Sequence, residues 1–127
     1  MQLEQQRFRD TLAIRNFKWC TWEAAVVVRD KIADAEGVKD IWTQLDHSRA
    51  EAAAVRLGIK WKVLKEFLRT RSNERQALAH PNLDLMAEQW RKTRPAFVRQ
   101  RPNVVEKYET LLQVAGVAIS DASNTNA

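Results

Sequence analysis

Cysteine and glycine are scarce in this 127-residue sequence, which has one Cys and three Gly. A disulfide cannot form within the chain because Cys20 has no second cysteine, and this is typical of a reducing interior. Three glycines leave no glycine-rich phosphate loop. Long apolar runs are also absent, and the first residues, MQLEQQRFRD, lack the features of a signal peptide. We therefore expect a soluble intracellular protein that does not associate with membranes.

Residues that could support catalysis or metal binding are also few. The two histidines, His47 and His80, are far apart in the sequence, and neither has a metal-ligand spacing with Cys20. Asp46 and Ser48 flank His47, but three adjacent residues do not form a catalytic triad, and turn and cap roles explain both better. The sequence therefore predicts a protein that is not an enzyme and that carries no metal or cofactor.

The remaining composition favours a single helical domain. Hydrophobic residues make up 45% of the chain, enough for a real core, and we find no convincing β-hairpin. We expect an all-α domain of five to six helices over residues 1–119, with a disordered tail at 120–127. The segment 3–16 is compatible with helix, and the expected helices are 22–36, 38–45, 49–57, 60–70, 83–92 and 104–115.

Several local signals set these boundaries. We expect Leu3, Phe8, Leu12 and Ile14 to be buried in the first segment. Thr21 has the chemistry of a cap for the second helix. All three glycines, Gly37, Gly58 and Gly116, stand where helices should end. Asn103 and Glu106 have the spacing of a capping box before the last helix. The five tryptophans are spread along the chain, so we expect most of them to pack between helices.

The most informative stretch is SRAEAAAVRLGIKWKVLKEFLR, residues 48–69. Ser48 and Glu51 have the spacing of a capping box, and the alanines that follow favour helix and allow a close helix crossing. Gly58 stands where the helix must end with positive φ. A second helix follows, with Leu64 and Phe67 on one face. The pattern predicts two short helices joined by a tight turn.

This stretch resembles the helix-turn-helix superfamily of DNA-binding proteins, in Ala54, in Leu57-Gly58-Ile59 at the turn, and in Leu64 and Phe67. The resemblance implies a tri-helical core, with 38–45 as its first helix, and a second motif helix that enters the major groove. It also implies a dimer on paired half-sites, through residues 104–115 or the N-terminal helix. We expect a small bacterial, phage or plasmid regulator. A purely structural helical hairpin is the alternative.

The face of the second motif helix opposite its apolar stripe carries Lys62, Lys65, Glu66 and Arg69. Such side chains can contact bases or phosphates, although a solvated helix face in which Glu66 pairs with Lys62 has the same pattern. Lys60 stands at the start of this helix, where a cation opposes the helix dipole unless an anion is bound. Trp61 borders the apolar stripe, so it is either a wall of the domain or a contact residue.

Charge is unevenly distributed along the chain. The formal net charge is +5, but segments 49–75 and 91–101 together carry +10 and the remainder carries −5. Such segregation is typical of a polyanion-binding surface. In the second segment, Pro95 and Pro102 argue against one uninterrupted helix and favour an extended arginine-rich arm that lies along phosphates or in a minor groove. Alternatively, Ala96, Phe97 and Val98 are buried and the arginines flank them.

The sequence thus predicts a double-stranded DNA-binding protein. The candidate DNA-binding residues are Arg49, Lys60, Trp61, Lys62, Lys65, Glu66, Arg69, Arg71, Arg75, Arg91, Lys92, Arg94, Arg99 and Arg101. Two other hypotheses remain open. Tryptophan and arginine are also the residues of protein-binding hot spots, so the chain could be an inhibitor or adaptor that docks an acidic partner. An RNA-binding helical protein would instead stack Trp22 or Trp61 on unpaired bases.

Overall fold

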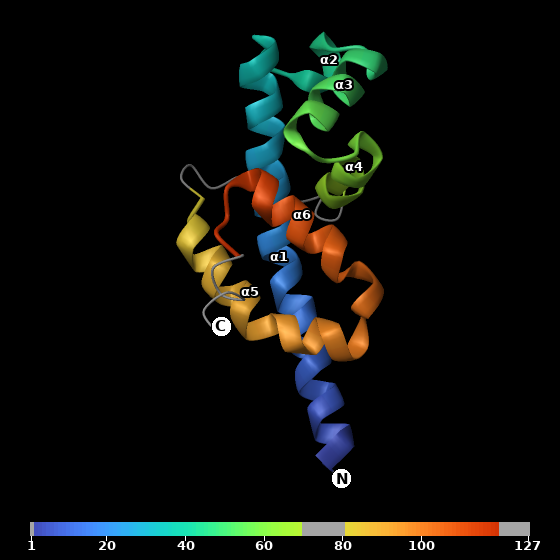
Figure 1. The fold of residues 1–127 in the computed structure, drawn as a ribbon, viewed down its shortest axis with the longest axis vertical. Coiled ribbons are helices and arrows are strands. Elements are labelled where there is room, and N and C mark those ends of the chain that lie inside the picture. Colours follow the sequence, from blue (N-terminus) through green and yellow to red (C-terminus); the bar gives the residue numbers. More distant parts are fainter. Residues whose placement is uncertain (1, 70–80, 120–127) are drawn as a thin grey trace.

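A computed structural model of the chain describes residues 2–69 and 81–119. The described residues form an all-α fold of six α-helices and one 3₁₀ helix, without a strand (Figure 1). The elements are α1 (Gln2–Glu36), α2 (Ile41–Gln44), α3 (His47–Leu57), α4 (Trp61–Arg69), α5 (Leu83–Gln100), η1 (Pro102–Val104) and α6 (Val105–Ala115). The predicted all-α class is confirmed, while the tail at 120–127 lies outside the described residues.

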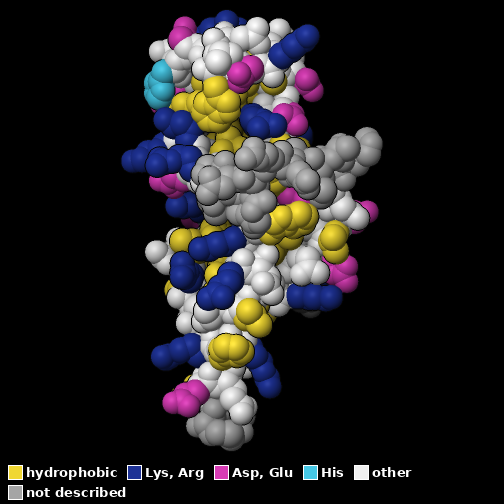
Figure 2. Space-filling model, turned by 180° about the vertical axis from the view of Figure 1, so that it is seen from behind, with side chains coloured by type: hydrophobic (Ala, Val, Ile, Leu, Met, Phe, Trp, Pro, Cys, Tyr) yellow, Lys and Arg dark blue, Asp and Glu magenta, His cyan; other side chains and the backbone are white. Residues whose placement is uncertain are grey.

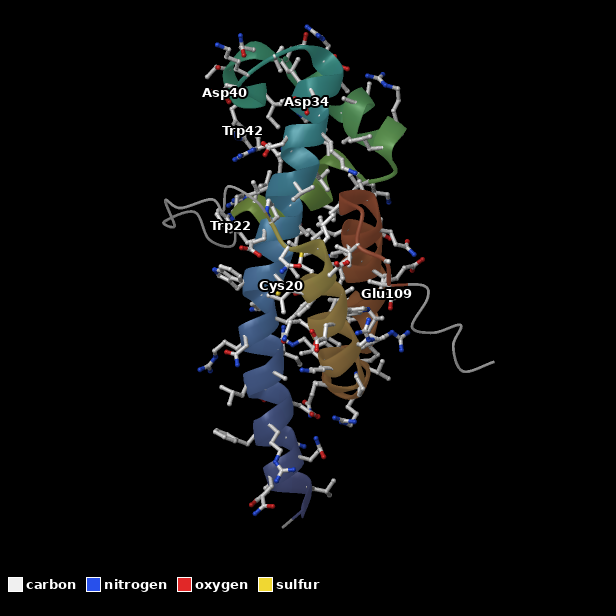
Figure 3. All side chains as sticks on the ribbon, turned by 90° about the vertical axis from the view of Figure 1, so that its left-hand side faces the viewer. Cys20, Trp22, Asp34, Asp40, Trp42 and Glu109 are labelled. Carbon is white, nitrogen blue, oxygen red and sulfur yellow. The ribbon has the colours of Figure 1, made fainter. Side chains whose placement is uncertain are left out.

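Helix α1 is the spine of the molecule. Its 35 residues correspond to a length of about 53 Å, and its N-terminal end projects beyond the other helices (Figure 1). Helices α5 and α6 pack against its middle, and α3 and α4 pack against its C-terminal half. In Figure 3, Trp22 lies on the side of α1 away from α5 and α6.

The helix-compatible segment 3–16 and the helix predicted at 22–36 are therefore one helix, and the prediction of a separate second helix was wrong. Thr21 does not cap a helix: its hydroxyl donates to the Lys18 carbonyl at 2.7 Å within α1, and the residue is 1% exposed. Of the side chains expected to be buried at the N-terminal end, only Ile14 is. Leu3, Phe8 and Leu12 are exposed, although α5 reaches the neighbouring Asp10 through Arg99.

The core is an aromatic cluster between α1, α4, α5 and α6. Phe17 of α1 lies 5.2 Å from Trp90 and 5.9 Å from Phe97, measured between ring centroids. Tyr108 of α6 stands 4.9 Å from Phe97 and 5.3 Å from Phe67. The Trp90 indole nitrogen donates to the Glu109 carboxylate at 3.0 Å, which satisfies its one polar atom. This cluster fixes α4 against the spine.

Helices α5 and α6 begin differently. Asn82 caps α5, since its side chain accepts from the Leu85 amide at 2.9 Å. The capping box expected at Asn103 and Glu106 is absent: η1 precedes α6, and the cap residue Val104 makes no side-chain hydrogen bond. The expected glycine ends are confirmed, because Gly37, Gly58 and Gly116 all have positive φ.

Candidate nucleic-acid interface

The turn between α3 and α4 is built as the sequence predicts. Gly58 has φ +110°, and its amide donates to the Ala54 carbonyl at 3.1 Å. The Ile59 amide donates to the same carbonyl at 3.1 Å, so the last carbonyls of α3 are satisfied before the chain turns. Ile59 itself is 4% exposed and anchors the turn in the core. A side chain at Gly58 would be strained by its φ.

The start of α3 differs from its prediction. Asp46 caps the helix, with a side-chain oxygen that accepts from the Arg49 amide at 2.8 Å, so Ser48 and Glu51 form no capping box. Asp46, two residues before Ser48, is the better cap. Its side chain also accepts a hydrogen bond from a backbone amide, and it adds a negative charge at the positive end of the helix dipole.

The third helix of this unit is α1, not the segment 38–45. That segment forms only the four-residue α2 at Ile41–Gln44. Helices α3 and α4 pack on each other and on α1, where Ala54 is fully buried and Ala50 and Ala53 are nearly so. These small side chains allow the close approach that a tight helix pair requires. The three-helix arrangement therefore uses the C-terminal half of the spine.

Helix α4 buries one face and exposes the other. Leu64 and Phe67 are 0% and 6% exposed. The opposite face, which we call the α4 face, consists of Lys62, Lys65, Glu66 and Arg69, as the helical period predicts, and of these only Lys65 is partly buried. Glu66 forms an ion pair with Lys107 of α6, at 3.5 Å. The sequence alone did not single out Lys107, because it lies outside both basic segments.

Two tryptophans flank the α4 face. Trp61 is 5% exposed, so it forms a wall of the domain. The other interpretation, that Trp61 contacts a ligand directly, does not fit this burial. The Lys65 ammonium lies 5.7 Å from its ring centroid, in cation–π range. Trp42 packs on Trp61 with ring centroids 5.4 Å apart and is 49% exposed at the far end of the molecule from the N-terminus (Figure 3). Trp42 therefore offers the exposed aromatic surface that the contact interpretation of Trp61 required.

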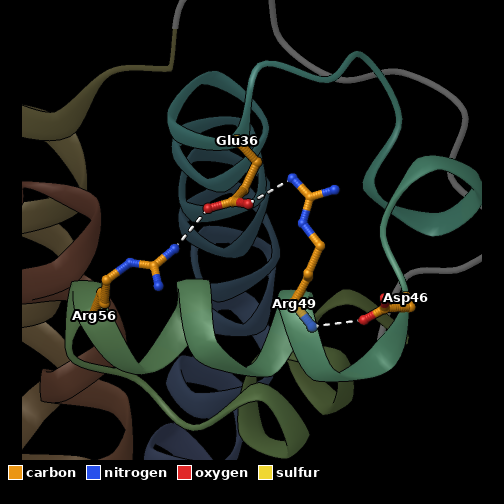
Figure 4. Close-up of polar contacts among 4 residues, drawn as sticks. All are labelled: Glu36, Asp46, Arg49 and Arg56. Atoms are coloured by element: carbon orange, nitrogen blue, oxygen red, sulfur yellow. Dashed lines mark hydrogen bonds and ion pairs between the residues drawn. The ribbon is translucent and has the colours of Figure 1, made fainter.

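Arg49 belongs to an intramolecular ion network at the protein surface (Figure 4). Its guanidinium donates to one oxygen of Glu36 at 2.9 Å, and Arg56 donates to the other at 2.6 Å. The network ties both ends of α3 to the C-terminal end of α1, so the charge of Arg49 is largely committed to the fold.

The second basic segment is not an extended arm. Helix α5 continues through Pro95 to Gln100, because Ala96 and Phe97 are 4% and 0% exposed and their burial outweighs the missing hydrogen bond. The alternative prediction, in which Ala96, Phe97 and Val98 are buried, is confirmed for Ala96 and Phe97, whereas Val98 is 45% exposed. Only Arg101, with φ −143°, lies outside the helix.

Most cations of this segment have acidic partners. Arg94 pairs with Glu109 at 2.7 Å, and Lys92 pairs with Glu88 at 3.5 Å. Arg99 binds both oxygens of Asp10, at 2.7 and 2.8 Å, and these hydrogen bonds hold the pKa of Asp10 well below its usual range. Within the described residues, Arg91 makes no ion pair.

Within residues 2–69 and 81–119, the two basic segments do not form one continuous surface. Helix α4 packs on α1 and α3, whereas α5 packs mainly on α1. Figure 2 accordingly shows Lys and Arg scattered over several levels of the molecule rather than in one band. Arg101 is the exception, since it lines the same cavity as Glu66 and Phe67 of α4. Arg71 and Arg75 lie outside the described residues.

Comparison of the chain with protein-family models, with curated proteins and with solved structures found no match. Among residues 2–69 and 81–119, no helix is long and apolar enough to cross a membrane. The same residues contain no cluster of His, Cys, Asp and Glu that could hold a metal ion.

Proposed function

We propose that the protein binds double-stranded DNA, as a small transcriptional regulator, by placing α4 in the major groove. The observation that carries the proposal is the α3–α4 pair itself: a left-handed glycine turn, a crossing lined with buried alanines, and an outward α4 face with three cations. Among the described residues, Lys62 and Arg69 make no ion pair, so both can donate to bases or phosphates.

Cations around α4 support the same role. Lys60 is exposed immediately before the helix, where a bound anion would offset its conflict with the helix dipole. Lys107 and Arg101 border the other side of α4 through the shared cavity. We assign the phosphate contacts to these residues, and the base contacts to the α4 face. We assign a smaller contribution to Arg49, Arg94 and Arg99, because each pairs at 2.7–2.9 Å with a carboxylate that is less exposed than that of Glu66.

We also propose that the protein binds as a homodimer, through the N-terminal half of α1. Phe8, Leu12 and Trp19 are 69%, 43% and 38% exposed, and at 100° per residue they lie within about 40° of one another. We call this stripe the α1 ridge. Spacings of four and seven residues are those of a helix–helix seam, so a second helix is the partner that fits. Two copies would present two α4 helices to paired half-sites.

Duplex binding at two salt concentrations tests the proposal. A labelled random duplex of about 20–25 base pairs, roughly two helical turns, is titrated with protein and followed by fluorescence anisotropy. Affinity should fall about 10³-fold or more between about 50 and 200 mM salt if six or more phosphates are contacted. Substituting Lys62→Ala and Arg69→Ala together should weaken binding and flatten the salt slope by about 0.9 for each phosphate that is no longer neutralised.

Arg7→Ala is the matched control. Arg7 is exposed on the projecting end of α1, far from α4, and its removal changes the net charge without touching the proposed interface. Equal effects of Arg7→Ala and the α4 substitutions would reduce the interaction to non-specific attraction. No binding at the lower salt concentration would reject DNA and favour an acidic protein partner. A preference for single-stranded RNA would favour the RNA-binding alternative.

A further inference from the structure

A cavity of about 190 Å³ lies where α1, α4 and α6 meet. It is several times larger than the roughly 30 Å³ that a water molecule occupies in the liquid, so it has room for a small solute. The residues that line it come from four elements of the fold and the residue before η1: Lys18, Thr21, Glu66, Phe67, Arg101, Val104, Lys107 and Tyr108.

The lining is strongly cationic. Lys18, Arg101 and Lys107 face a single carboxylate, that of Glu66, so the four side chains together carry +2. Within the described part of the chain, neither Lys18 nor Arg101 forms an ion pair. The Lys107–Glu66 pair is 3.5 Å long with both side chains at least 40% exposed, so it is weak and leaves the Lys107 ammonium able to bind elsewhere.

The neutral groups around the cavity add a hydrogen-bond donor. The ring of Tyr108 is held in the aromatic core, and among the described residues its hydroxyl has no hydrogen-bond partner. Burial raises the pKa of Tyr108, and the charge of Arg101 opposes that shift only in part, so the phenol stays protonated near neutral pH. The amides of Val104 and Val105 already donate to the Arg101 and Pro102 carbonyls, and the Thr21 hydroxyl donates to the Lys18 carbonyl, so the Tyr108 hydroxyl is the neutral donor of this lining that remains.

We propose that this cavity binds a phosphate group, held by Lys18, Arg101 and Lys107. A phosphate monoester carries about −1.5 to −2 charges near neutral pH, which matches the +2 of the lining, and its oxygens accept several charge-assisted hydrogen bonds. The guanidinium of Arg101 can bind it bidentately, and the two ammonium groups approach from α1 and α6. The tetrahedral phosphate suits donors that converge from three directions.

Two sources could supply the phosphate. Because Glu66 of the α4 face lines the cavity, a backbone phosphate of bound DNA could occupy it. A small phosphorylated molecule could do so instead, and its competition with Glu66 for Lys107 would change the charge of the α4 face. The phosphate site does not depend on the DNA proposal, since it can be tested without nucleic acid.

The test is a titration of the full chain with inorganic phosphate at constant ionic strength, followed by two-dimensional NMR. We expect saturable shifts at Lys18, Arg101, Val104, Lys107 and the ring of Tyr108. Arg101→Gln should weaken the phosphate Kd by about tenfold, the change expected when one charge-assisted interaction is removed. Arg91→Gln is the matched control, since Arg91 is exposed on α5 and does not line the cavity.

Repeating the titration with duplex DNA separates the two sources. Competition between phosphate and duplex, with weaker duplex binding in Arg101→Gln, assigns the cavity to a DNA phosphate. Simultaneous binding assigns it to a free phosphorylated molecule. Small, non-saturating shifts spread over all basic side chains, equal in Arg101→Gln and Arg91→Gln, would overturn the phosphate site, whether or not the protein binds DNA.

Discussion

At the scale of single residues, Asp10 shows how a basic sequence cluster can serve the fold. Arg99 was expected to contact DNA, yet its guanidinium lies on Asp10, which is 2% exposed and also accepts from Gln6 at 2.9 Å. The contact joins residues 89 positions apart in the sequence. No local pattern indicates it, because Asp10 is one of six acidic residues in α1 and only the packing of α5 against α1 selects it.

Asp10→Asn should lower the free energy of unfolding by about 2 kcal/mol at pH 7, since it removes charge-assisted hydrogen bonds from a buried site. The pKa of Asp10 is lowered in the folded protein by its hydrogen bond with Arg99. The stabilisation is therefore present above the unfolded value, near pH 4, and is lost as the pH falls further. Urea unfolding at pH 7 and pH 3 measures both effects, with exposed Asp34→Asn as control. An equal cost at both pH values would contradict the charged role of Asp10.

The pKa of Glu23 is shifted in the opposite direction from that of Asp10. Glu23 is 4% exposed, and within the part of the chain that the structure describes one of its carboxylate oxygens has no hydrogen-bond partner. Burial raises its pKa, so the folded state holds the proton more tightly than the unfolded state does. Stability from this group is therefore greatest below the unfolded pKa and is lost as the pH rises through the folded value.

Glu23→Gln should consequently raise the melting temperature at pH 7 and leave it almost unchanged near pH 4. Thermal unfolding followed by circular dichroism measures the difference, and Glu51→Gln, which alters an exposed side chain of α3, is the control. A lower melting temperature for Glu23→Gln at pH 7 would mean that the carboxylate is needed in its charged form.

At the scale of elements, helix boundaries could be predicted from the sequence wherever the local residues favour one conformation only. Gly58 ends α3 as expected because only glycine adopts its φ of +110° without strain. The prediction failed at Thr21 because a hydroxyl can cap a helix or bond within one, and the choice depends on whether the preceding residues are helical. It failed at Pro95 because proline disfavours helix locally, while the burial of Phe97 is a tertiary effect.

Pro95→Ala should therefore stabilise the protein. The substitution restores a main-chain donor within α5 and removes the clash of the ring with the preceding turn, which outweighs the greater freedom of the unfolded chain. We expect a gain of about 1–2 kcal/mol in the free energy of unfolding, measured in urea. Val98→Ala, at an exposed position of the same helix, should change it by less than about 0.5 kcal/mol. A lower stability of Pro95→Ala would mean that the core requires a bend at this point.

At the scale of the whole molecule, the two basic segments of the sequence do not gather into one surface within residues 2–69 and 81–119. The sequence correctly indicated which side of α4 is polar, since that follows from its own 3.6-residue period. It could not indicate that Glu36, Glu109 and Asp10 would neutralise arginines of both basic segments. Lys18 and Lys107 were missed for the same reason, because only the packing of α1 and α6 brings them beside α4.

The N-terminal end of α1 projects beyond the other helices and leaves apolar side chains exposed to water. Figure 2 shows hydrophobic side chains on its narrow lower end, with Lys and Arg on both sides. Water-exposed apolar stripes of this kind are typical of interaction sites, and burying a side chain such as Phe8 contributes about 1.5–3 kcal/mol. Arg15 falls within the stripe, where its aliphatic stem can cover apolar surface while the guanidinium reaches water.

The double substitution Phe8→Glu and Leu12→Glu should therefore convert a dimer into a monomer without unfolding it, because both side chains are exposed in the single chain. Light scattering on a sizing column should give the mass of two chains for the wild type and of one for the variant. Arg7→Glu, a charge change off the ridge of the same helix, should leave the mass at two chains. Under the DNA proposal, the monomeric variant keeps the affinity for a single half-site and no longer binds paired half-sites more tightly, since the α4 face is intact. A wild type that stays monomeric at concentrations well above its DNA Kd would assign the α1 ridge to a different protein partner.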